Sequence, residues 1–170
     1  MGSGKTTLGR ELARRIGRTF IDCDQELEQR LGVRVSTVFE IEGEAGFRVR
    51  ETRLLKELVQ RDDLVLATGG GAVLCEENRA WLRKHCLVAY LKVAPGVLWE
   101  RLRHDRTRPL LQVPNPRACI EALYREREPL YCEVADVILE GGRGGVTHMV
   151  NKLEGLLAQL CEQRGESLRT

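Results

Sequence analysis

The sequence has few of the patterns that identify membrane-spanning, secreted or zinc-binding proteins. Its apolar stretches are no longer than single strands, so none could cross a bilayer, and we expect no secretory signal because Lys5 already belongs to a motif. The six cysteines form no CxxC pair, and the three histidines do not stand at metal-ligand spacing. These absences argue against a disulfide framework and a zinc site, and we expect a cytoplasmic protein with ordinary thiols.

Aromatic residues are scarce as well, at 5%, and neither sign of charge dominates. The 27 basic and 25 acidic residues leave a net charge of +2, and the basic residues are spread along the chain. This balance argues against a protein dedicated to nucleic acids or membrane surfaces. The 170 residues are 42% hydrophobic, enough for one domain with its own core. We expect a monomeric domain over residues 1–162 and a polar tail over 163–170.

Apolar periodicity predicts strands and helices that alternate along the chain. The predicted helices cover residues 5–16, 25–31, 45–60, 76–85, 95–104, 121–127 and 146–161, and the predicted strands cover residues 19–23, 64–68, 87–93 and 134–139. Strands that are apolar on both faces and alternate with helices indicate an α/β domain with a mostly parallel sheet. Ligands of such sheets lie at the carboxyl ends of the strands. The search for a site therefore starts where the strands end.

The first predicted helix begins with a segment that suits a nucleotide phosphate. Its residues are Gly2, Ser3, Gly4, Lys5, Thr6 and Thr7. Glycines let backbone N–H groups crowd around an anion, and the start of a helix adds a favourable dipole. In the phosphate-loop pattern, Lys5 would reach the β- and γ-phosphates and the Thr6 hydroxyl would face magnesium. The alternative is a flexible Gly/Ser start to a helix, which the direct run into an amphipathic segment disfavours.

The phosphate-loop pattern is incomplete in this sequence. The full pattern GxxxxGK[ST] has a glycine five residues before Gly4 and follows a strand, and neither is present. Two explanations remain, a start upstream of Met1 or a natural half-loop, and we favour the first. Because the strand before such a loop is usually central, we expect its absence to leave a gap in the sheet.

Three further groups of residues carry chemistry, two of them at strand ends and one on the third helix. Asp22 and Asp24 close the first predicted strand, where one carboxylate could hold magnesium-bound water and the other an acceptor hydroxyl; the alternative for Asp24 is a helix cap. Glu51 falls on the apolar face of its helix, three residues after Arg48, and we interpret it as orienting that arginine toward a substrate carboxylate. A solvated ion pair is the alternative. Gly69–Gly71 would let a ligand approach the backbone closely, unless they form a plain turn.

Basic residues gather in the second half of the chain. Arg101 and Arg108 belong to an arginine- and proline-rich stretch that is typical of a lid over phosphates; an RNA-binding patch is the alternative, weakened by the lack of interleaved aromatics. Arg127 stands before Pro129, which we expect to end its helix, and is a second candidate anion clamp.

In this order and spacing, the motifs GSGKTT, IDCD, EGEAGFRVRE, GGGAV, RTRPLL and REPLY make residues 1 to about 140 resemble the shikimate kinase family. The resemblance implies a three-layer α/β/α fold of the P-loop nucleoside-monophosphate-kinase type, with four strands visible here where the family has five. It also implies a lid at about 104–118 and a shikimate-binding helical region at about 24–60.

The resemblance further implies ATP-dependent phosphorylation of the shikimate 3-hydroxyl, with Mg2+, on the route to chorismate. Residues 2–7 would bind the ATP phosphates, Thr6 and Asp22 would flank magnesium, Arg101 would stack on adenine, and Arg108 would reach the transferred phosphoryl group. Asp24 would contact the shikimate hydroxyls, while Arg48, Arg127 and Gly69–Gly71 would hold its carboxylate. The implied partners are ATP and shikimate alone. A gluconate-type kinase, or a non-catalytic relative disabled by the absent strand, remains as an alternative.

Overall fold

The computed structural model describes residues 2–103, 111–141 and 145–165 of the chain. Its elements follow in the order α1 (Lys5–Ile16), β1 (Thr19–Asp22), α2 (Cys23–Leu31), α3 (Val35–Leu58), β2 (Leu64–Ala67), η1 (Ala72–Leu74), α4 (Glu76–His85), β3 (Ala89–Val93), α5 (Pro95–Leu102), α6 (Pro116–Val134), β4 (Val137–Gly141) and α7 (Val146–Arg164). Helices and strands therefore alternate as the periodicity predicted.

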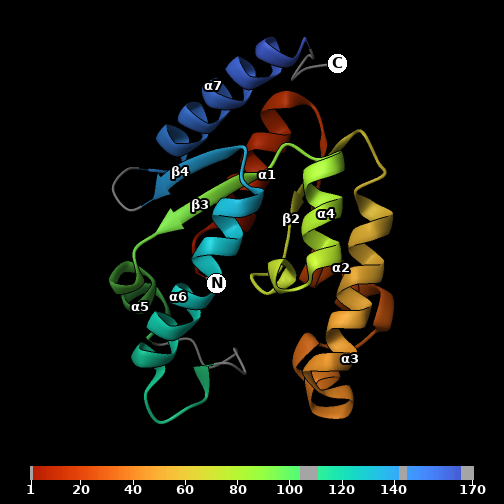
Figure 1. Ribbon diagram of the computed structural model, residues 1–170, viewed down its shortest axis with the longest axis vertical. Coiled ribbons are helices and arrows are strands. Elements are labelled where there is room, and N and C mark those ends of the chain that lie inside the picture. Colours follow the sequence, from red (N-terminus) through yellow and green to blue (C-terminus); the bar gives the residue numbers. More distant parts are fainter. Residues whose placement is uncertain (1, 104–110, 142–144, 166–170) are drawn as a thin grey trace.

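The strands pair in two separate parallel sheets. β1 pairs with β2, from Thr19 opposite Leu64 to Asp22 opposite Ala67. β3 pairs with β4, from Ala89 opposite Val137 to Val93 opposite Gly141. Within the described residues no strand joins β2 to β3, and Figure 1 shows the two pairs as separate. The expected gap in the sheet is thus present, between β2 and β3.

Helices cover both faces of the strands, which gives the expected α/β/α arrangement (Figure 1). On one face α1 and α7 pack together, and α1 lies on β1 and β2 while α7 lies on β4. The buried side chains of this layer are Leu8, Leu12, Ile16, Leu91, Val137, Leu139, Val150, Leu153 and Leu157. A second cluster joins α2, α3 and α4 to the first strand pair through Leu54, Leu55, Leu58 and Leu82.

Two predicted helices are longer in the structure. The helix predicted over 45–60 is the part of α3 that follows a break at Gly43, whose φ of 70° and ψ of -178° are not helical. A helical segment that begins at Val35 precedes this break, and its Val38 is buried in the α2–α3 cluster. The helix predicted over 121–127 is α6, and its cap is Asn115, whose side chain accepts a hydrogen bond from the Ala118 N–H.

Pro129 does not end α6, contrary to the prediction. It lies inside the helix, which continues to Val134. A proline removes one hydrogen bond of the ladder, and burial of side chains on both sides of it, Arg127 and Val134 among them, holds the helix through that position. Smaller differences concern boundaries: Cys23 begins α2 instead of ending a strand, β4 begins at Val137, and α7 continues to Arg164.

Candidate functional site

The phosphate-loop segment is built around two glycines with left-handed backbone conformations. Gly2 has a φ of 68° and Gly4 a φ of 90°, values that side chains other than glycine rarely adopt. Gly4 is the N-cap of α1, so the free N–H groups of that helix begin at Lys5. Arg101 of α5 donates from Nη1 to the Gly2 carbonyl oxygen over 3.2 Å. The segment therefore forms an anion-receptive helix start, with a cationic side chain beside it.

Thr6 and Asp22 meet at the carboxyl end of β1. The Thr6 hydroxyl donates to Asp22 Oδ2 over 2.7 Å. The other carboxylate oxygen accepts from the backbone N–H groups of Asp24, at 3.1 Å, and Gln25, at 3.5 Å. Asp22 is therefore the N-cap of α2, and the cap interpretation considered for Asp24 is wrong.

Asp24, Glu51 and Gly69 come together from three different elements. A methyl group placed on Gly69 would lie 3.1 Å from Asp24 Oδ1 and 2.6 Å from Glu51 Oε1. A Cβ at this position would force both carboxylates to shift, so the absence of a side chain at Gly69 lets them lie against the backbone. The same holds for Gly71, where an added Cβ would overlap the Arg48 guanidinium.

Glu51 is a nearly buried carboxylate, with 4% of its surface exposed. Arg48 donates from Nη1 to Glu51 Oε2 over 2.7 Å and from Nη2 to Glu44 Oε1 over 2.8 Å. Burial raises the pKa of Glu51, and the charge of Arg48 offsets part of that rise. Glu51 thus orients Arg48, as the sequence predicted, and a second carboxylate, Glu44, adds to it.

Arg127 of α6 is a second cation near Glu51 and is only 7% exposed. Within the described part of the chain its Nε has no hydrogen-bond partner, and neither has Glu51 Oε1. Leaving buried polar groups unpaired is costly, and such atoms in native proteins often mark a binding site. Glu51 Oε1 lies against Gly69, and Arg127 is near enough to Glu51 for its charge to lower the pKa of that carboxyl.

Tyr131 lines the same cavity as Arg127 and Gly70, and the sequence interpretation gave it no role. Its hydroxyl donates to the Gly70 carbonyl oxygen over 2.6 Å. Burial raises the pKa of Tyr131, and the neighbouring Arg127 charge lowers it in part. Arg127 and Tyr131 are four residues apart and so share a helix face. That spacing could have identified Tyr131 if the helix had been predicted to continue past Pro129.

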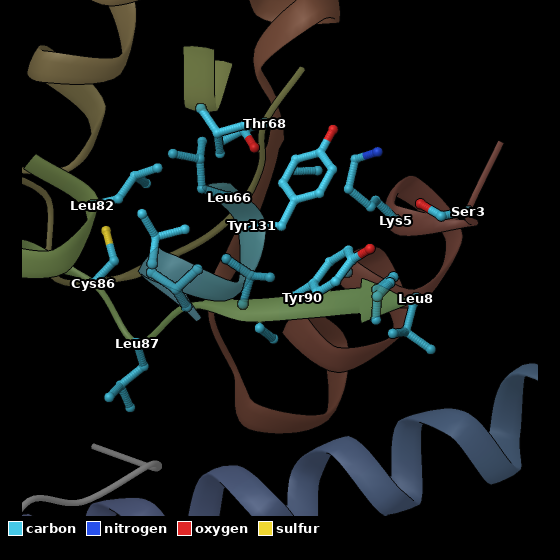
Figure 2. A pocket seen from close by; sticks show the side chains of 18 of the residues that line it. Ser3, Lys5, Leu8, Leu66, Thr68, Leu82, Cys86, Leu87, Tyr90 and Tyr131 are labelled. Carbon is cyan, nitrogen blue, oxygen red and sulfur yellow. The ribbon is translucent and has the colours of Figure 1, made fainter. Parts of the chain in front are cut away.

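Of the remaining predicted site residues, some lie in the described part of the chain and one lies outside it. Ser3 and Lys5 line a cavity that Tyr131 also lines (Figure 2), and Thr7 lies in α1. Arg108 and most of the expected lid lie outside the described residues. Among the described residues, no cluster of three His, Cys, Asp or Glu side chains could hold a metal ion, and no helix is long and apolar enough to cross a membrane.

Comparison with known proteins gives consistent results. The shikimate kinase family model matches residues 1–155. The shikimate kinase of Aromatoleum aromaticum is 62% identical over 154 residues, which cover 91% of this chain and 88% of that protein. The shikimate kinase of Chromobacterium violaceum is 54% identical over 153 residues, 90% of this chain and 83% of that protein.

Solved structures agree with the sequence comparisons. A shikimate kinase from Acinetobacter baumannii in complex with shikimate has a TM-score of 0.91 at 44% identity, over 94% of this chain and 89% of that one. A gluconokinase from Sinorhizobium meliloti reaches a TM-score of 0.64 at 19% identity, over 96% of this chain and 90% of that one, a likeness of fold alone.

Proposed function

Because the chain belongs to the shikimate kinase family, we propose that it transfers the terminal phosphoryl group of ATP to the 3-hydroxyl of shikimate. The products are shikimate 3-phosphate and ADP, on the route to chorismate and the aromatic amino acids. The observation that carries the assignment to this site is that Asp24 lies against Gly69 and Arg48 against Gly71, with Arg127 near Glu51. We call these residues, with Glu51 and Tyr131, the acceptor pocket.

The acceptor pocket matches the chemistry of a small hydroxylated carboxylate. Arg48 is already fixed by two carboxylates, so its remaining donor directions can be used by a ligand without loss of side-chain entropy. Arg127 brings a buried Nε that needs an acceptor. Two arginines can bind one carboxylate, while Asp24 accepts hydrogen bonds from hydroxyl groups and can take the proton of the reacting one.

The phosphate-loop segment binds the other substrate. Backbone N–H groups of residues 2–7 and the Lys5 ammonium neutralise the ATP phosphates, and Arg101 extends from α5 toward the nucleotide as a surface for adenine. The family resemblance assigns Arg108 to the transferred phosphoryl group. Because phosphoryl transfer depends chiefly on positioning and charge neutralisation, these cations account for most of the rate.

Thr6 and Asp22 fit a divalent cation that arrives with ATP. Since the Thr6 proton is directed to Asp22 Oδ2, the hydroxyl lone pairs are left for a cation, and the Asp22 carboxylate is suited to hold a metal-bound water. Mg2+ commonly takes one or two protein oxygens and completes its shell with phosphates and water. When bound, the ion neutralises charge on the β- and γ-phosphates.

We further propose that the protein is a monomer and that it works in the cytoplasm. The six free cysteines agree with the second of these, since thiols stay reduced there. The alternative of a gluconate-type kinase is supported only by a similar fold, and no feature of the acceptor pocket favours gluconate over shikimate as the substrate. One assay distinguishes an active kinase from a non-catalytic relative.

That assay measures ADP release from magnesium-ATP by the 170-residue chain with shikimate, with gluconate and with neither. We expect release that depends on shikimate, with the phosphate on the 3-hydroxyl by phosphorus NMR. Equal release with gluconate would contradict the substrate assignment, and absence of release from a folded chain that binds shikimate would contradict catalysis.

A further inference from the structure

In the segment that links β2 to α4, every carbonyl oxygen from the first glycine to the end of η1 accepts a hydrogen bond. The carbonyls of Gly69 and Gly71 accept from backbone N–H groups of the same segment, at 3.2 and 3.0 Å. Those of Ala72–Leu74 accept from side chains of α4. The Gly70 carbonyl differs, because its partner is the hydroxyl of Tyr131 on α6. The segment is therefore held by its own backbone and by α4, and from α6 at this one point.

The hydrogen bond from Tyr131 fixes one peptide unit, the one that joins Gly70 to Gly71. The described residues contain no cis peptide bond, so the C=O of this unit and its N–H point in opposite directions. With the Gly70 carbonyl held by Tyr131, the Gly71 N–H is directed away from the hydroxyl. Glycines on both sides would otherwise let the unit turn over at little steric cost. Tyr131 thus supplies a constraint that the glycine backbone lacks.

The Gly71 N–H has a cationic neighbour, the guanidinium of Arg48. A Cβ added to Gly71 would overlap Nη2 of that guanidinium, so Arg48 lies directly against the Gly71 backbone. Arg48 is itself held by Glu44 and Glu51, through hydrogen bonds of 2.8 and 2.7 Å. A backbone donor fixed from α6 and a guanidinium fixed within α3 are therefore adjacent, and a carboxylate has two oxygens to accept from two such donors.

The Tyr131 side chain is well suited to hold this carbonyl. Its ring stacks on the ring of Tyr90 in β3, with centroids 4.9 Å apart and planes 28° apart, which fixes the direction of the hydroxyl. Burial raises the pKa of Tyr131, so the phenol keeps its proton at neutral pH and remains a donor. The distance of 2.6 Å to the Gly70 oxygen is at the short end for an O–H donor.

We propose that Tyr131 is a positioning residue of the acceptor pocket, an inference that rests on the proposed function. Its hydroxyl holds the Gly70 carbonyl, so that the Gly71 N–H is presented, beside the Arg48 guanidinium, to the carboxylate of the acceptor. Because Arg127 lies one turn earlier on α6, the same helix places a cation and sets the direction of a backbone donor. Tyr131 acts through a backbone group that binds, so it governs affinity for the acceptor and not the phosphoryl-transfer step.

The first test is the kinetics of Tyr131→Phe, which removes the hydroxyl and keeps the ring that stacks on Tyr90. The KM for shikimate should rise roughly tenfold, because the Gly70 carbonyl loses its partner. The KM for ATP and kcat should stay within twofold. Tyr124→Phe is the matched control, since it removes a hydroxyl of the same helix that bonds to Glu128 over 3.2 Å, and it should change none of the three constants. An unchanged shikimate KM in Tyr131→Phe, or an equal rise in Tyr124→Phe, would overturn the proposal.

The second test needs neither ATP nor shikimate. Nitrogen-15 relaxation of the free chain measures the order parameter of the Gly71 amide, which is about 0.85 in a rigid backbone and below about 0.6 in a flexible one. We expect a rigid value in the wild type and in Tyr124→Phe, and a flexible value in Tyr131→Phe. An equally rigid Gly71 amide in Tyr131→Phe would overturn the proposal, and a lower unfolding temperature alone would then show a purely structural role. A wild type without shikimate-dependent turnover would contradict the proposed function instead, and this order parameter would still decide the role of Tyr131.

Discussion

The two halves of the site are built in different ways: the acceptor half is the acceptor pocket, and the nucleotide half is the phosphate-loop segment with Asp22. In the acceptor pocket, ion pairs and hydrogen bonds between 2.6 and 2.8 Å fix Arg48, Glu51 and Tyr131. In the nucleotide half, the left-handed backbone at Gly2 and Gly4 leads into the start of α1, and the Thr6 hydroxyl donates to Asp22 Oδ2. The acceptor half is therefore organised by side chains that hold one another in place, whereas the nucleotide half relies on the backbone of a helix start.

The sharpest separation of the two halves comes from Lys5→Ala. Removing this ammonium should lower kcat by about 10²–10³-fold, because a preorganised charge at the phosphates is lost. Shikimate affinity should stay within twofold, since the acceptor pocket does not contain Lys5. Steady-state kinetics and shikimate titration check both; a matching loss of shikimate affinity would mean that the halves are not separable.

Gly71→Ala should damage the acceptor half alone. The added methyl group overlaps the Arg48 guanidinium and must displace it. Loss of a hydrogen bond to a charged group costs about 1.5–3 kcal/mol, so the KM for shikimate should rise roughly 10- to 150-fold with the KM for ATP unchanged. Gly155→Ala, in open space on α7, is the matched control and should change neither constant.

Substitutions of Asp22 test whether this residue, which caps α2, also helps to bind the metal ion. Asp22→Asn keeps a good N-cap for α2 and loses the charge, so thermal stability should stay within about 0.5 kcal/mol while the magnesium requirement rises. Asp22→Ala should also lose about 1 kcal/mol of stability. Thermal unfolding and a magnesium titration of activity separate these effects, and an unchanged magnesium requirement in Asp22→Asn would exclude the metal role.

The smallest effect concerns the pH dependence of Glu51. Burial raises its pKa in the folded chain, so on acidification the native state takes up this proton before the unfolded state does. The contribution of Glu51 to stability therefore increases as the pH falls from 7 through its folded pKa. Relative to Glu51→Gln, the wild type should gain stability from pH 7 to pH 5 in urea titrations; a relative loss would contradict a raised pKa.

The helices and side-chain pairs that depend on a local sequence pattern could be predicted from the sequence. The helices over Lys5–Ile16 and Glu76–His85 have the predicted bounds, and the pairing of Arg48 with Glu51 follows from a charge on an apolar face. Tyr131 could not be predicted in the same way, because its partner is the backbone of Gly70, 61 residues away, and because Pro129 indicated a helix end. The helical segment before Gly43 was missed; its first N–H group, at Val35, donates to Glu28 Oε1 of α2, a partner that the apolar periodicity does not indicate.

The central claim is that the acceptor pocket is formed for shikimate independently of the nucleotide half. Calorimetric titration of the 170-residue chain with shikimate, in the absence of nucleotide, tests it most directly, with Arg48→Ala as the paired variant. We predict one shikimate bound per chain, with affinity reduced at least tenfold in Arg48→Ala while both proteins unfold at similar temperatures. Absence of binding by the folded chain, or equal affinity in the variant, would contradict the claim.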